Sequence, residues 1–333
     1  MADFLKPEQY RFNIFKRFTA MLATHLRLSA RILLTLALLT LAGCSSTPPA
    51  ATPAAAPPAP LRVALALGGG AARGFAHVGV IKALEAQGII PDIIVGTSAG
   101  SVVGALYAAG YNGFELQQVS MTMDENQVSD WSLPNRGMIK GEALQDFINR
   151  AVHHLTLEKL KKVFAVVATD LRSGEMIVFR TGNTGMAVRA SSSVPGIFQP
   201  VSINGREYVD GGLISPVPVR VARALGADFV IAVDISDKPQ YSKTESSIDV
   251  LLQTFNIMGQ TISRNELKEA DVVIRPVTPG ISSTDFKDKH QAVLQGEKAV
   301  AAILAELKDK LAKRNDVRPA LPALESFAKN PSN

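Results

Sequence analysis

The chain has 333 residues, of which 47% are hydrophobic and 20% charged, and this is the composition of a globular protein rather than a disordered one. The formal net charge is +5, but residues 1–43 hold six Lys or Arg against two Asp or Glu, so the remainder carries only +1. That remainder has no basic run, so we do not expect a nucleic-acid partner.

The first 43 residues have the pattern of a secretion signal. An uncharged apolar run over residues 32–43 is too short to span a bilayer. It ends directly before Cys44, and small residues followed by cysteine resemble a bacterial lipobox. We therefore predict that Cys44 is lipidated, the alternative being a chance cysteine. Met1 or Met21 could be the true start. Cys44 is the only cysteine, which excludes an internal disulfide.

Residues 44–60 begin at the predicted lipidation site, Cys44. Residues 45–60 consist only of Ala, Pro, Ser and Thr and carry no charge, which is typical of an extended tether. A lipidated cysteine would anchor the protein to the bacterial envelope. Ser45, rather than an aspartate, follows the cysteine, and by analogy with lipoprotein sorting this favours the periplasmic face of the outer membrane.

Strands and helices alternate at short intervals through the next 50 residues. The pattern predicts strands over 61–67 and 92–96, and helices over 74–87 and 99–109. This alternation favours an α/β fold with a mainly parallel sheet, in three α/β/α layers.

Further elements follow without a linker-like gap. We expect helices over 114–123, 141–154, 217–225, 247–268 and 288–312. We also expect strands over 163–169 and 175–181, paired around Ser173-Gly174, and over 229–234 and 272–277. The elements indicate one domain over 61–313, followed by a poorly ordered tail over 314–333. Residues 121–140 could form a mobile lid or an ordinary surface connection.

Ser98 lies at the centre of a Gly-x-Ser-x-Gly pattern, flanked by Gly96 and Gly100. The pattern places a serine on a sharp turn between a strand and a helix, with its hydroxyl at the helix N-terminus. An apolar strand precedes it and a helix follows, so we interpret Ser98 as a nucleophile. The alternative is a helix-capping serine in a glycine-rich turn.

A glycine-rich loop, Gly68-Gly69-Gly70-Ala71-Ala72-Arg73-Gly74, follows the first predicted strand. Its backbone N–H groups could bind a phosphate or a tetrahedral oxyanion. The loop matches neither the dinucleotide-binding fingerprint nor the Walker A motif. A nucleophile turn one strand–helix unit later favours an oxyanion. The alternative is a tight turn without a ligand.

Asp210-Gly211-Gly212 follows a short strand-like segment, and taken alone it favours a hairpin turn. Together with the glycine loop and the Ser98 turn, in this order, it resembles the patatin-like phospholipases over residues 61–235. Ala71-Ala72-Arg73 is similar to the bacterial branch, since plant patatins have one residue fewer here. Softer similarities lie at 168–171 and 189–198.

The resemblance implies a Ser98–Asp210 dyad, with Ser98 as nucleophile and Asp210 as general base. It also implies an oxyanion hole built on Gly68, Gly69, Gly70, Ala71 and Arg73, in which Arg73 orders the loop. The expected substrates are phospholipids or lysophospholipids in a membrane. The chemistry needs no cofactor or metal, and the sequence shows no metal-ligand spacing.

Two other hypotheses remain at this point. A Ser–His–Asp triad esterase would need a late histidine, for which His290 is the candidate, with Asp234 as its partner. His290 lies at a charged helix start, which is more typical of a solvated residue. The second hypothesis is a catalytically idle lipoprotein that binds lipid or a partner. The sequence indicates no oligomeric state.

Overall fold

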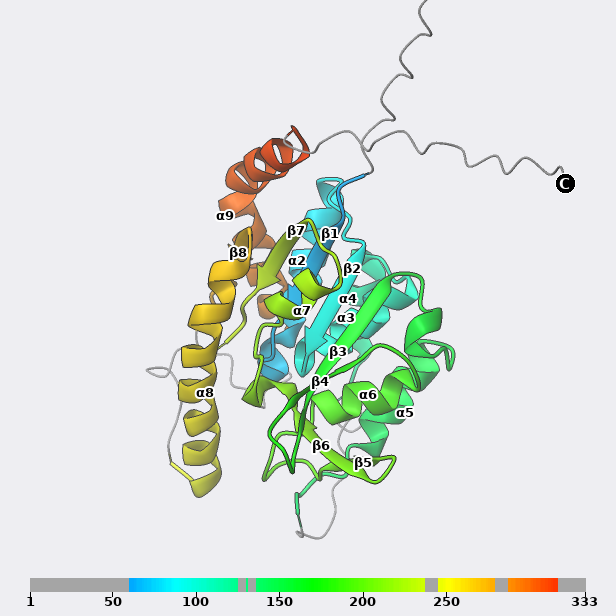
Figure 1. Cartoon of the computed structure of the whole chain (residues 1–333). Helices are drawn as coiled ribbons and strands as arrows, with labels where there is room; N and C mark the ends of the chain where they lie inside the picture. The colour runs from blue at the N-terminus through cyan, green and yellow to red at the C-terminus, as the bar shows by residue number, and fades with distance from the viewer. Residues whose placement is uncertain (1–59, 125–129, 131–135, 237–244, 279–286, 317–333) are drawn as a thin grey trace, which may run out of the picture. The chain divides into compact units, whose positions relative to one another are not determined.

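We describe a computed structural model of the chain over residues 60–124, 130, 136–236, 245–278 and 287–316 (Figure 1). The predicted signal peptide, Cys44 and the tether up to residue 59 lie outside the described residues, as does the chain beyond Asp316.

The described part contains one eight-stranded sheet in the order β5-β6-β3-β2-β1-β7-β8, with β4 also paired to β3. The five adjacent strands from β3 to β8 are parallel, β4 and β6 each pair antiparallel with β3, and β5 pairs antiparallel with β6. The prediction of a mainly parallel sheet is therefore confirmed, with antiparallel pairs added at one end. The strands are β1 (Val63–Leu67), β2 (Ile93–Thr97), β3 (Val163–Asp170), β4 (Met176–Phe179), β5 (Val201–Ile203), β6 (Arg206–Asp210), β7 (Phe229–Val233) and β8 (Val272–Ile274).

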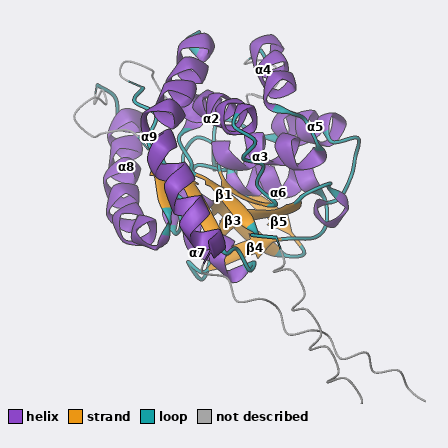
Figure 2. Ribbon diagram, turned by 90° about the horizontal axis from the view of Figure 1, so that it is seen from above, coloured by secondary structure: helices purple, strands orange, loops and turns teal. Residues whose placement is uncertain are grey.

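Helices cover both faces of the sheet and make three layers (Figure 2). Alternate residues of β1 point to opposite faces, so Leu65 and Leu67 pack in one apolar cluster, and Ala64 and Ala66 in another. The larger cluster lies under α2 (Phe75–Ala86), α3 (Ala99–Ala109), α4 (Gly113–Thr122), α5 (Glu142–Ala151) and α9 (Lys289–Asp316). The smaller one lies under α7 (Val219–Ala224), next to the end of α8 (Ser247–Glu266).

Two glycines bring α2 and α9 into backbone contact. A Cβ atom on Gly79 would lie 1.9 Å from the Val293 carbonyl oxygen, and one on Gly296 would lie 2.1 Å from that of Ala76. No side chain fits at either position, so α9 packs directly on α2. Because α2 begins directly after the glycine loop, this contact supports the loop from behind.

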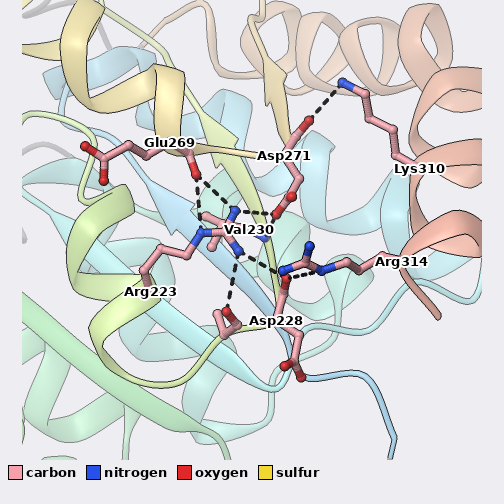
Figure 3. A network of polar contacts seen from close by, with 8 residues as sticks. Arg223, Asp228, Val230, Glu269, Asp271, Lys310 and Arg314 are labelled. Carbon is pink, nitrogen blue, oxygen red and sulfur yellow. Dashed lines mark hydrogen bonds and ion pairs between the residues drawn. The ribbon is translucent and has the colours of Figure 1, made fainter. Parts of the chain in front are cut away.

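A polar network closes the edge of the sheet at which β7 and β8 begin (Figure 3). Arg223 of α7 donates to the Asp271 carboxylate over 2.6 Å and to the carbonyl oxygens of Glu269 and Asp228. From α9, Arg314 donates to the Asp228 carbonyl oxygen over 3.1 Å. α9 continues to Asp316, so the first three residues of the predicted tail, 314–316, are helical and the last turn is bonded to the sheet. The rest of the predicted tail lies outside the described residues.

Most predicted elements agree with the structure to within a few residues, but two were missed. These are α6 (Thr184–Ser191) and β5 (Val201–Ile203). Both lie in the part of the chain that leads to Asp210. None of the described helices is both long and apolar enough to cross a membrane.

Candidate active site

Ser98 lies between β2 and α3 in a backbone conformation that a non-glycine residue rarely adopts, with φ 52° and ψ −124°. Its two flanking glycines make this turn possible. A Cβ on Gly96 would lie 2.5 Å from the Cα of Ser101, and one on Gly100 would lie 2.1 Å from the Leu67 carbonyl oxygen. The sequence motif therefore forms a nucleophile elbow, in which β1 and α3 approach too closely for any side chain.

Hydrogen bonds hold the elbow on both sides. The Ser98 N–H donates to Ser191 Oγ over 2.9 Å, and the Ser191 hydroxyl donates to the Val167 carbonyl oxygen over 2.5 Å. The Ser101 hydroxyl donates to the Ser98 carbonyl oxygen over 2.7 Å. The backbone of Ser98 is thus fixed to α6 and β3. Ser191 lies in the segment 189–198 that resembles the family, but the sequence does not predict this contact.

Asp210 ends β6, the strand that pairs antiparallel with β3. Its N–H donates to the Ser193 carbonyl oxygen over 2.9 Å, and its own carbonyl oxygen accepts from Thr169 Oγ1 over 2.9 Å. Oδ1 accepts from the Gly212 N–H over 2.6 Å, so the Asp-Gly-Gly motif caps its own carboxylate. A Cβ on Gly211 would lie 2.2 Å from the Val167 carbonyl oxygen, which explains why this position needs glycine.

Burial raises the pKa of Asp210 from its usual value of 3.8 to about 6. The adjacent Ser98 hydroxyl and the Gly212 N–H act in the opposite direction. Oδ2 of Asp210 is nevertheless buried without a partner in normal hydrogen-bond geometry among the described residues. Ser98 and the carboxylate are therefore neighbours whose mutual hydrogen bond is not fully formed, a common state of catalytic pairs without substrate.

The glycine loop adjoins the nucleophile, since a Cβ on Gly69 would lie 3.2 Å from the Cβ of Ser98. Two of its predicted oxyanion donors are used within the fold: the N–H of Gly68 donates to Val233 O, and that of Gly69 to Pro216 O. The N–H groups of Gly70 and Ala71 have no acceptor among the described residues. The structure thus narrows the candidate donors to Gly70 and Ala71.

Arg73 and His77 support this loop from below. Arg73 is buried and its Nε donates to the Ile235 carbonyl oxygen over 3.0 Å, which agrees with the predicted ordering role. The Nε2–H of His77 donates to the Gly68 carbonyl oxygen over 2.8 Å, because a carbonyl can only accept. Burial lowers the pKa of His77 to about 4, so the ring is neutral at pH 7. The sequence around His77 carries no signal that predicts this contact.

The histidine of the alternative triad lies elsewhere. His290 is exposed in the first turn of α9, and the described structure gives it no hydrogen bond to Ser98 or to a carboxylate. Its proposed partner Asp234 accepts from Ser236 and pairs with Arg275 over 3.5 Å. The carboxylate beside the nucleophile is that of Asp210.

Residues 121–140, a mobile lid or an ordinary surface connection by sequence, lie only partly in the described structure. Residues 125–129 and 131–135 are outside it, and the rest of 121–140 includes Ile139, which forms a bridge to Phe198. Within the described ranges, no group of three or more His, Cys, Asp or Glu side chains could hold a metal ion.

Comparison with known proteins agrees with this geometry. A family model described as patatin-like phospholipase matches residues 65–223, which include the glycine loop, Ser98 and Asp210. An uncharacterized NTE family protein of Mycobacterium tuberculosis is 35% identical over 204 residues, which are 61% of this chain and 57% of that protein. Patatin-like phospholipase domain-containing protein 6 of Homo sapiens is 37% identical over 186 residues, which are 54% of this chain and 14% of that protein.

The chain thus spans about half the length of the mycobacterial relative and a small part of the human one. Among solved structures, VipD from Legionella pneumophila is similar with a TM-score of 0.52 at 15% identity, over 75% of this chain and 68% of that one. This likeness shows the fold alone. Residues 65–223 therefore form a patatin-like phospholipase domain.

Proposed function

We propose that this protein is a serine acyl-ester hydrolase that acts on membrane phospholipids or lysophospholipids through a Ser98–Asp210 dyad. The observation that carries the proposal is a strained, glycine-flanked serine next to a buried carboxylate. Among the described residues, one oxygen of that carboxylate and two nearby backbone N–H groups have no hydrogen-bond partner. Each of these groups has a distinct task in ester hydrolysis.

In the first step, the Ser98 oxygen attacks the ester carbonyl carbon while the Asp210 carboxylate accepts the hydroxyl proton. A pKa of about 6 suits this task, because the carboxylate is ionised at pH 7 yet more basic than an exposed aspartate. The tetrahedral oxygen would be bound by the N–H groups of Gly70 and Ala71. Such donors are each worth roughly 3–4 kcal/mol in the transition state.

The intermediate then collapses, the ester C–O bond breaks, and the leaving alcohol takes the proton from Asp210. Water attacks the acyl-Ser98 ester with Asp210 again as the base, which releases the fatty acid and restores the serine. The dyad thus performs both halves of the reaction without a histidine. His77 takes no proton in this scheme, because it is buried, neutral and bonded to the Gly68 carbonyl oxygen.

We further propose that Cys44 is lipidated and holds the domain at a bacterial envelope membrane, on the periplasmic face of the outer membrane. The support is the sequence around Cys44 and the lipid substrate class. Two or more acyl chains are needed for a stable anchor. Replacing Cys44 with alanine should move the protein out of the membrane fraction, and unchanged retention would argue against lipidation.

The dyad is tested by labelling with a fluorophosphonate probe and by turnover of a short-chain soluble ester. Wild type should label at Ser98 and turn over the ester, and Ser98→Ala should do neither. His290→Ala is the matched control and should keep near-normal activity. Loss of activity in His290→Ala would support a triad instead, and absence of labelling in wild type would support an idle lipid-binding protein.

A further inference from the structure

The outer face of α8 has an unusual composition for a helix on a protein surface. Between residues 250 and 263 the helix carries no charged residue. Its exposed positions there include Val250, Leu251, Ile257 and Met258, with Thr254 and Thr261 on the same side. Val250, Ile257 and Met258 are each about half exposed, at 52, 51 and 51%. Surface helices normally place charged residues on this face.

The apolar face, defined here by Val250, Leu251, Ile257 and Met258, lies beside the proposed active site. Leu251 contacts the loop that follows Ser193, since a Cβ on Gly196 of that loop would lie 2.9 Å from Leu251. The Ser193 carbonyl oxygen in turn accepts from the Asp210 N–H, so the loop connects α8 to the proposed base. In Figure 1 the N-terminal half of α8 extends past the carboxyl ends of the parallel strands, where Ser98 lies.

The C-terminal end of α8 fixes it to the nucleophile elbow. The buried Glu266 carboxylate accepts from the Ser215 hydroxyl over 2.8 Å, and the Ser215 carbonyl oxygen accepts from Thr97 Oγ1 over 2.9 Å. Thr97 precedes Ser98 directly. The apolar face is therefore held at a set position relative to the nucleophile, at the edge where an ester would enter.

Other exposed apolar side chains gather at the same edge of the sheet. Leu171 comes directly after β3, Ile214 follows the Asp-Gly-Gly turn, and Val277 lies just beyond β8. Charged residues lie only towards the two ends of α8, with Asp249 in the first turn and Arg264 in the last. An uncharged apolar face between them complements the apolar region of a bilayer.

We propose that the apolar face of α8 docks on the lipid bilayer and delivers its lipids to Ser98. This inference rests on the proposed lipid substrate. The chain before β1 is consistent with it: β1 begins at the opposite edge of the sheet from Ser98, and the 16 residues from Cys44 to Ala59 could reach about 50 Å at roughly 3.1 Å per residue. β1, with five residues, spans only about 17 Å between the two edges of the sheet. The tether is longer than this distance, so the Ser98 edge could face the bilayer while Cys44 is anchored in it.

The docking is tested with a local probe in the full chain. Cys44→Ser removes the only cysteine and the anchor, Ser98→Ala removes turnover, and Met258→Cys then accepts an environment-sensitive fluorophore. The matched control carries Ile90→Cys instead; Ile90 is 57% exposed and lies just before β2, at the opposite edge of the sheet. The vesicles contain phosphatidylethanolamine and phosphatidylglycerol.

On addition of vesicles, the emission of the probe at residue 258 should shift to the blue and be quenched by lipid-borne quenchers, while the probe at residue 90 should not respond. Equal responses, or none at residue 258, would overturn the proposal. A blue shift at residue 258 that depends on protein concentration without vesicles would also overturn it, and would assign the face to a second copy of the chain.

A second measurement separates docking from chemistry. The double variant Val250→Glu with Ile257→Glu should lower turnover of phospholipid in vesicles about tenfold, because two apolar contacts are lost and two charges enter the interface. Its turnover of a monomeric soluble ester should equal that of wild type. Equal loss on both substrates, or no loss on either, would contradict the docking role. Failure of wild type to hydrolyse the soluble ester would instead refute the proposed function.

Discussion

Replacing Asp210 with asparagine should abolish activity and, at neutral or higher pH, stabilise the fold. The amide keeps an oxygen that can accept from the Gly212 N–H, so the local turn is preserved. It removes the charge that burial disfavours and also the base that Ser98 needs. One substitution thus separates the cost of holding an ionised carboxylate in the core from the benefit that the carboxylate gives to catalysis.

The magnitude follows from the pKa of Asp210. A rise from 3.8 to about 6 corresponds to about 3 kcal/mol, at roughly 1.36 kcal/mol per pKa unit. Because the folded pKa is raised, the folded protein holds this proton more tightly than the unfolded chain does. The stabilisation is complete below pH ~4 and is lost as the pH rises through ~6. Asparagine has no such dependence.

The free energy of unfolding is measured by urea denaturation of both proteins at pH 4 and pH 8. The advantage of Asp210→Asn over wild type should grow by up to about 3 kcal/mol between the two pH values. Turnover of a soluble ester should fall by about 10²–10⁴-fold. A difference in stability that does not change with pH, or substantial residual turnover, would refute the assignment of Asp210 as a buried base.

Three further predictions concern the same fold. The value of kcat/KM for a soluble ester should fall as the pH drops through about 6, because protonated Asp210 cannot act as a base; a flat profile down to pH 4.5 would contradict this. His77→Phe should lower kcat about tenfold, because it releases the Gly68 carbonyl oxygen. It should also remove the loss of stability that a buried histidine of pKa about 4 causes as the pH falls from ~6.5 to ~4. Turnover and urea denaturation over that pH range test the two effects, and a variant that still loses stability in acid would contradict the role given to His77. Arg223→Ala should destabilise the fold by about 1–3 kcal/mol without changing kcat, whereas Arg220→Ala, in an exposed pair with Glu269, should destabilise it much less. Equal losses of stability in thermal or urea unfolding would show that the Arg223 network contributes no more than an exposed ion pair.

Much of the fold could be predicted from local patterns. Apolar periodicity gave the helices and strands around Ser98, since β1, α2, β2 and α3 are each bounded by glycine or proline. The short β5 and the eight-residue α6 carry too few residues for a clear period, so they were missed. The antiparallel end of the sheet was predicted only where β4 returns along β3.

The chemistry of the site was predictable only in part. Ser98 and the glycine loop could be identified from their sequence motifs. Asp210 could be identified only through the family resemblance, because an aspartate before glycines usually forms a turn. Hydrogen bonds between residues that lie far apart in the chain could not be predicted from the sequence. The loss of Gly68 and Gly69 as oxyanion donors depends on Val233 and Pro216, and the contact of Ser191 with Ser98 depends on α6.

The residues of the site are spread widely along the chain, and this bears on when activity can begin. Ser98 and its glycine loop lie in one strand–helix–strand unit, but the base arrives with β6, and the loop is fixed by Val233 and Ile235 at the end of β7. A chain that is synthesised from its N-terminus therefore contains Ser98 long before Asp210 and the residues that fix the loop are added. Under the proposed mechanism only the completed sheet can hydrolyse an ester, so the order of synthesis delays activity until the domain has folded.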